Sequence, residues 1–184
     1  PTSTFPTAAA VEVPSSFTNV YLSGQVPPLQ DAAAPKNSAA AYGGDTKGQT
    51  IGVLKAIEKS LTGLGLTMGD VVKMQVFLVG DPAKDNKMDF AGFMEGYTQF
   101  FGTTAQPRLP VRSTREVAGL VNPAYLEENE VTAVRPAKSK YPPRRYEWRS
   151  SHNFRLSAAA AGPKIPPVGA RAVVRTVQFN GKQE

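Results

Sequence analysis

The fold is decided by residues 71–79, which read Val71-Val72-Lys73-Met74-Gln75-Val76-Phe77-Leu78-Val79. Because side chains alternate between the two faces of a strand, this stretch has one wholly apolar face. That face consists of Val72, Met74, Val76 and Leu78. The other face carries Lys73 and Gln75 beside Phe77. Such a pattern predicts a strand that helices cover on one side and that is partly polar on the other.

Amphipathic helices are predicted on both sides of this strand. Asp45 is expected to cap the first helix, which Gly63 and Gly65 end. Its apolar stripe has three- and four-residue spacing and comprises Ile51, Leu54, Ile57 (or Glu58), Leu61 and Leu64. Asp89 is expected to cap the second helix, which Gly102 ends. Its stripe comprises Phe90, Phe93, Met94, Tyr97, Phe100 and Phe101, and we interpret it as core rather than as a ligand box.

Further β-like stretches lie near both ends of the motif-bearing part of the chain. Residues 11–13 and 20–26 are predicted to form a hairpin through Pro14-Ser15-Ser16. A second hairpin is predicted for residues 112–120 and 128–135, with a turn around Asn122-Pro123. The resulting order predicts an α+β fold, a mixed sheet with two helices on one face. The uncovered face would expose Phe77 and Val79, so we expect subunits to associate there.

Composition excludes several classes of protein. The chain has 184 residues, no Cys and a single His. These counts exclude disulfide scaffolds, thiol catalysis and multi-His metal sites within one subunit, so no metal and no cofactor are predicted. No apolar run approaches the ~20 residues of a membrane span, which predicts a soluble chain. The P-loop, G-x-G-x-x-G, G-x-S-x-G and H-E-x-x-H motifs are also absent.

The charge is concentrated at the C-terminal end. Residues 1–138 hold 12 basic and 13 acidic residues, whereas residues 139–184 hold 9 basic residues and only Glu147 and Glu184 as acids. We therefore predict a body, 1–138, and a basic extension rich in Pro and Ala, 139–184, with one strand at 172–179 and little core of its own. Its arginines alternate with aromatic residues, a mixture that can bind nucleic acid, although a solvated or subunit-wrapping extension or foreign sequence is the more common explanation.

Two groups of residues in the body can carry chemistry. Arg112 begins a predicted strand, and an arginine can hold a carboxylate with two parallel N–H···O bonds. The acidic cluster Glu127-Glu128-Asn129-Glu130 offers a carboxylate that can orient water or move a proton. From spacing alone, a surface ion pair between such strands is the more common arrangement. His152, in the basic extension, is interpreted as solvated.

Several motifs resemble one known family. Val20-Tyr21-Leu22-Ser23-Gly24-Gln25-Val26-Pro27 resembles the SGQ signature of the Rid family, the YjgF/YER057c/UK114 group of enamine/imine deaminases. Residues 65–77, 89–101, 110–118 and 128–134 are similar to its further motifs in the expected order, so the resemblance covers about 5–138. It implies a chorismate-mutase-like fold and a homotrimer with active sites between subunits.

The resemblance also implies roles for individual residues. Arg112 would bind the substrate carboxylate, Glu128 would help to position the attacking water, and Ser23 and Gly24 would line the pocket. Three departures are visible. Thr7 and Met94 stand where the family often has Tyr and Asn, and Asn129 lies on an expected apolar face, where it needs a hydrogen bond. The departures favour another substrate, or a slower or absent reaction.

Three hypotheses about function follow. The first is hydrolytic deamination of small 2-enamino or 2-imino acids to 2-oxo acids and ammonia, without a cofactor. The second is a non-catalytic trimer that binds small carboxylate metabolites in the same cleft. The third is an RNA-directed, endoribonuclease-like role, for which the basic extension is the only support. The compartment stays open between export after signal-peptide removal and cytoplasmic residence.

Overall fold

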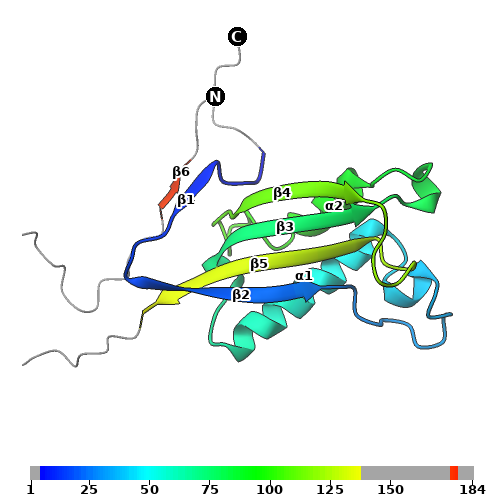
Figure 1. Cartoon of the computed structure of the whole chain (residues 1–184), viewed down its shortest axis with the longest axis horizontal. Coiled ribbons are helices and arrows are strands. Elements are labelled where there is room, and N and C mark those ends of the chain that lie inside the picture. The colour runs from blue at the N-terminus through cyan, green and yellow to red at the C-terminus, as the bar shows by residue number, and fades with distance from the viewer. Residues whose placement is uncertain (1–4, 138–174, 178–184) are drawn as a thin grey trace, which may run out of the picture.

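The computed structural model describes residues 5–137 and 175–177. One sheet has the strand order β2-β5-β3-β4, with β5 antiparallel to β2 and β3, and β3 parallel to β4. Its strands are β2 (Phe17–Gln25), β3 (Val71–Val79), β4 (Val111–Val117) and β5 (Glu127–Pro136). Helices α1 (Thr46–Gly63) and α2 (Phe90–Tyr97) lie against one face of this sheet (Figure 1). The predicted α+β class with a mixed sheet is confirmed.

Short 3₁₀ helices occupy three of the connections: η1 (Ala39–Tyr42), η2 (Met68–Asp70) and η3 (Pro82–Lys84). Within the described residues, no helix combines the length and the hydrophobicity that crossing a membrane requires.

The main core lies between the two helices and the covered face of β3. Met74, Val76 and Leu78 are buried there, as the alternation predicts. They pack in one cluster with α1 and α2 residues, among them Val53, Leu54, Ile57, Leu61, Phe93 and Tyr97. Leu64, predicted as part of the α1 stripe, is 45% exposed because it is the C-cap, after which Gly65 (φ +71°) turns the chain.

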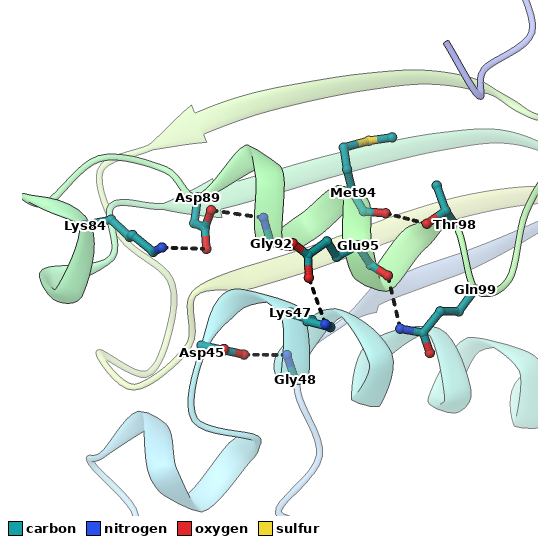
Figure 2. A network of polar contacts seen from close by, with 10 residues as sticks. All are labelled: Asp45, Lys47, Gly48, Lys84, Asp89, Gly92, Met94, Glu95, Thr98 and Gln99. Carbon is teal, nitrogen blue, oxygen red and sulfur yellow. Dashed lines mark hydrogen bonds and ion pairs between the residues drawn. The ribbon is translucent and has the colours of Figure 1, made fainter. Parts of the chain in front are cut away.

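Both predicted helix N-caps are confirmed (Figure 2). The Asp45 carboxylate accepts a hydrogen bond from the Gly48 backbone N–H at 2.7 Å, and that of Asp89 accepts one from Gly92 N–H at 3.0 Å. An ion pair of 2.8 Å between Lys47 and Glu95 links the two helices at the surface. Helix α2 ends at Tyr97, earlier than predicted; residues 98–101 continue as turns and reach Gly102 (φ +74°).

The predicted N-terminal hairpin is wrong. Strand β1 (Ala10–Glu12) pairs antiparallel with β6 (Arg175–Val177) and not with β2. The cause lies just before β1: the backbone N–H of Ala8 and the hydroxyl of Thr7 both donate to the Pro110 carbonyl, at 3.0 and 3.1 Å. Pro110 precedes β4, the opposite edge of the sheet from β2, so this tether keeps β1 away from β2. Strand β6 lies within the predicted strand at 172–179.

The second predicted hairpin is also wrong, because β3 lies between β4 and β5. The connection from β4 to β5 is not a tight turn but packs beneath α1. The Gln49 side chain, itself fully buried, donates to the Ala124 carbonyl at 2.9 Å and accepts from the Leu126 N–H at 2.8 Å. These two bonds satisfy the buried carbonyl of Ala124 and the N–H of Leu126. In a hairpin, strand pairing would satisfy such groups.

Candidate carboxylate-binding site

Arg112 points to the helix-covered face of the sheet. It is paired with Met74 of β3, whose side chain is fully buried in the core. Its guanidinium carbon lies over four aromatic rings, with distances to the centroids of 5.5 Å for Phe5, 5.8 Å for Phe90, 5.0 Å for Phe93 and 4.3 Å for Tyr97. We call these four residues the aromatic box. Cation–π attraction of this kind holds a guanidinium in place without neutralising its charge.

The charge of Arg112 has no counter-ion in the described part of the chain. Its Nη1 atom is buried without a hydrogen-bond partner there, and the ion pairs found there join Lys47 to Glu95 and Lys84 to Asp89. Burial lowers the pKa of the Arg112 guanidinium, but arginine stays protonated in proteins. Burial also raises the pKa of Tyr97, whose hydroxyl therefore stays neutral. A desolvated cation without an anion is suited to take one up.

Ser23, Gly24 and Glu128 come together on the opposite face. The pairing of β2 with β5 shifts between Leu22 and Gln25, which places Ser23 and Gly24 in a β-bulge. The Glu128 side chain lies over Gly24, so close that an added Cβ there would be 2.9 Å from Glu128 Cδ. Ser23 is exposed and Glu128 is half-buried. The Glu128 carboxylate thus lies beside the bulge at the uncovered face, next to exposed Ser23 in the chain of β2.

The two groups of predicted site residues do not meet within one chain. Glu128 is paired with Phe77, and Arg112 is paired with Met74. Because side chains alternate along β3, Met74 and Phe77, three positions apart, point to opposite faces. Strand β3 also separates β5 from β4 in the sheet. Arg112 therefore lies in one half-site, and Ser23, Gly24 and Glu128 lie in another.

Asn129 and the neighbouring Glu127 form a buried polar cluster on the covered face. Both side chains are fully buried. The Asn129 amide donates to Glu127 Oε1 at 2.7 Å, so the hydrogen bond that the sequence required is present, and the Thr50 hydroxyl of α1 donates to Glu127 Oε2. Burial raises the pKa of Glu127 to about 8, although both of these bonds oppose the shift. Burial therefore favours the protonated form of Glu127, which lies in the core apart from the half-site of Glu128.

The aromatic box around Arg112 is not predicted from the sequence. The aromatic stripe of α2 was interpreted as core, which holds for Phe93 and Tyr97, but both also contact the guanidinium. Phe5 lies outside the motifs and stripes that the sequence reveals. Its ring stacks on Phe90 at 6.2 Å and 13°. The one signal in the sequence is the helical spacing of these aromatic residues, which forms a surface on which the long side chain of an arginine can pack.

Apart from the two half-sites, a metal centre and a surface hollow are the other kinds of site that a chain can offer. Within the described residues, no group of three His, Cys, Asp or Glu side chains is arranged to hold a metal ion. A surface hollow of about 920 Å³ lies where β3 begins. Its lining includes Thr67, Asp70, Phe100, Gln106 and Arg108 but not Arg112. The hollow is therefore distinct from the aromatic box.

A protein-family comparison places the chain. The family model described as "Endoribonuclease L-PSP" matches residues 4–135, which is most of the chain. The chain belongs to this family, the YjgF or Rid family. It is 34% identical over 119 residues to the Escherichia coli protein named "Putative reactive intermediate deaminase TdcF", covering 64% of this chain and 80% of that one. A RutC family protein of Pyrococcus horikoshii is 33% identical over 96 residues, covering 52% and 67%.

Solved structures agree at the level of the fold. The Rid family protein YyfB from Yersinia pestis aligns with a TM-score of 0.50 and 23% identity, covering 67% of this chain and 84% of YyfB. The Mycobacterium tuberculosis member Rv2704 of the YjgF/YER057c/UK114 family aligns with a TM-score of 0.45 and 27% identity, covering 62% and 77%. The fold of this chain is thus similar to that of YyfB.

Proposed function

We propose that this Rid family protein hydrolyses small 2-enamino or 2-imino acids to 2-oxo acids and ammonia. The observation that carries the proposal is Arg112, a half-buried cation whose Nη1 atom is buried and which has no acidic partner in the described part of the chain. A substrate carboxylate would supply the missing anion with charge-assisted hydrogen bonds. The 34% identity with a protein named for reactive intermediate deamination supports the same chemistry.

The reaction needs few groups. Arg112 holds the carboxylate, while a water oxygen forms a bond to C2 of the iminium and the C=N π electrons move to nitrogen. One proton of that water passes to the nitrogen, the C–N bond breaks as the C2 hydroxyl gives up its proton, and ammonia leaves with the 2-oxo acid. Glu128 would orient the water and take the proton in transit. Positioning accounts for much of the rate, because iminium ions are already reactive.

The separation of the half-sites bears on assembly. A single chain keeps Arg112 and Glu128 on opposite faces of the sheet, so we propose that a neighbouring subunit brings the second half-site to the first in a homotrimer. The uncovered face supports this proposal because Phe77 and Val79 are only half-buried there and Tyr21 is 75% exposed. Light scattering at micromolar concentration tests it, and the mass of a monomer would refute it.

The function is tested with freshly generated 2-iminopropionate, whose disappearance is followed with and without protein. Because a charge-assisted hydrogen bond is worth about 1.5–3 kcal/mol, Arg112→Ala should lower kcat/KM about 10- to 100-fold. Arg108→Ala is the matched control, because Arg108 is an exposed arginine that lines the hollow distinct from the aromatic box. Circular dichroism shows whether both variants are folded. Equal rates for folded wild type and Arg112→Ala would overturn the proposal.

One observation favours the alternative, a non-catalytic carboxylate-binding protein. Within one chain, no described carboxylate pairs with or hydrogen-bonds Arg112. A general base for the reaction must therefore come from a neighbouring subunit or be absent. Binding of pyruvate by the wild type, lost in Arg112→Ala, together with no acceleration of imine loss, would establish this alternative. The RNA-directed hypothesis rests on the extension, most of which lies outside the described residues.

A further inference from the structure

The aromatic box is closed on its inner side and open on its outer side. Phe93 and Tyr97 are fully buried and belong to the core, and Phe90 is half-buried. Phe5 is 45% exposed. Phe5 is therefore the most exposed of the four rings, and it forms the outer wall of the box.

Phe5 is held in this position by several contacts. Its ring stacks on Phe90, and its carbonyl accepts a hydrogen bond from the Thr7 backbone N–H at 2.8 Å. The hydroxyl of Thr7 and the N–H of Ala8 bind the carbonyl of Pro110, two residues before Arg112. The segment that carries the wall is thus tied to the strand that carries the cation. Such a wall is pre-organised, which makes it able to discriminate between ligands.

The box also constrains how a carboxylate binds. Ring faces lie against the guanidinium, so a carboxylate must approach in the guanidinium plane, where its N–H groups point. The substituent of a carboxylate bound in this way is left on the solvent side of the box, where Phe5 is the most exposed ring. An apolar substituent gains by leaving water there, whereas a charged or strongly polar one loses hydration without finding a hydrogen-bond partner on a phenyl ring.

We propose that Phe5 is a specificity-determining residue and that it selects 2-imino acids with an aromatic or bulky apolar side chain over those with a small or polar one. The proposal rests on the proposed function, since it names the substrate class of the Arg112 site. Phe5 contacts the side chain of the substrate and leaves the reacting carbon to other groups. Its removal should therefore act mainly on KM and not on kcat.

The experiment compares two imines in the full chain. The imines of phenylalanine and of alanine are generated in situ with an amino-acid oxidase, and kcat and KM are measured for wild type, Phe5→Ala and Phe5→Leu. Leu29→Ala is the matched control, because Leu29 is 48% exposed and lies in the loop that follows β2. We expect wild type to have the higher kcat/KM for the phenylalanine imine. In Phe5→Ala the ratio of the two kcat/KM values should fall about tenfold, through a higher KM for the phenylalanine imine. Phe5→Leu should retain part of it, and Leu29→Ala all of it.

Binding of phenylpyruvate and of pyruvate, measured by calorimetry, separates this inference from the proposed function. If no imine is hydrolysed but phenylpyruvate binds more tightly than pyruvate and Phe5→Ala removes the difference, the reaction is refuted and the specificity stands. If both imines are hydrolysed and the ratio of their kcat/KM values is the same in wild type and folded Phe5→Ala, the role of Phe5 is refuted and the reaction stands. Equal loss for both imines in Phe5→Ala likewise overturns it, because a wall that merely supports the fold does not discriminate.

Discussion

The carboxylate of Glu128 occupies the space that a side chain at residue 24 would need. A Cβ added to Gly24 would overlap Glu128 Oε1 and lie 2.9 Å from Cδ. The contact crosses from β2 to β5 at the bulge of Ser23 and Gly24. The present position of the Glu128 carboxylate therefore requires glycine at residue 24, whereas the backbone there does not, since its φ is not positive. The half-site of Glu128 exists in this form only because residue 24 has no side chain.

Gly24→Ala should displace the Glu128 carboxylate and leave the fold intact. The flexible end of Glu128 can swing toward the uncovered face, so the melting temperature should change little, while imine hydrolysis should fall at least about tenfold. Gly63→Ala is the control, because nothing lies within 4 Å of a Cβ at residue 63. Unchanged kinetics in a folded Gly24→Ala protein would show that the position of Glu128 does not matter for the reaction.

Glu127 should make the protein less stable as the pH rises. The pKa of its buried carboxyl is raised to about 8, from an ordinary value of 4.5, so the folded state holds the proton more tightly than the unfolded state. Its contribution is fully present below pH 4.5, declines between pH 4.5 and about 8, and is lost above that. Thermal melts across this range should show the decline.

The variant Glu127→Gln isolates this group, because an amide of the same shape cannot ionise. Its melting temperature should depend less on pH between 5 and 8 than that of wild type. Glu58→Gln, on the exposed side of α1, should behave like wild type. A pH dependence that is identical in wild type and Glu127→Gln would show that Glu127 is ionised in the folded protein.

Tyr97→Phe should leave the protein as stable as wild type or make it more stable. The Tyr97 hydroxyl is buried without a hydrogen-bond partner in the described part of the chain, so removing it abolishes a desolvation cost and breaks no bond. The ring, which contacts Arg112 and stacks on Phe101 at 4.9 Å, is preserved. Denaturant unfolding measures the difference, and destabilisation by more than about 1 kcal/mol would reveal a partner for the hydroxyl, such as a bound water.

Residues 139–184 should be dispensable for the chemistry. The residues of both half-sites lie within 1–138, and the charges of this body are balanced without the extension. Truncation removes β6 and its short pairing with β1, which should cost little stability. Residues 1–138 should remain folded and trimeric and keep any imine hydrolysis, as sedimentation and the imine assay would show. Aggregation would mean that the extension is part of the assembly, whereas salt-sensitive RNA binding lost on truncation would support the nucleic-acid hypothesis.

Local patterns in the sequence predict the elements of this fold well. The alternation in residues 71–79 identifies a strand and its buried face, and Asp45 and Asp89 mark helix starts. These features depend on neighbours a few residues apart, which the sequence displays directly. The predicted hairpins fail because strand adjacency depends on distant contacts. Hydrogen bonds to Pro110 hold residues 7–8 at the β4 edge, and Gln49 anchors the connection before β5.

For the site, the sequence shows which residue types are available: one arginine at the start of a strand, a carboxylate at Glu128 and the small Ser23-Gly24 pair. The surroundings of these residues become visible only once the chain is folded. It places Arg112 in an aromatic box on the covered face and Glu128 over Gly24 on the other. Strand pairing and register determine the face on which a side chain lies. The surroundings of a buried group determine its charge. Both depend on residues far apart in the chain.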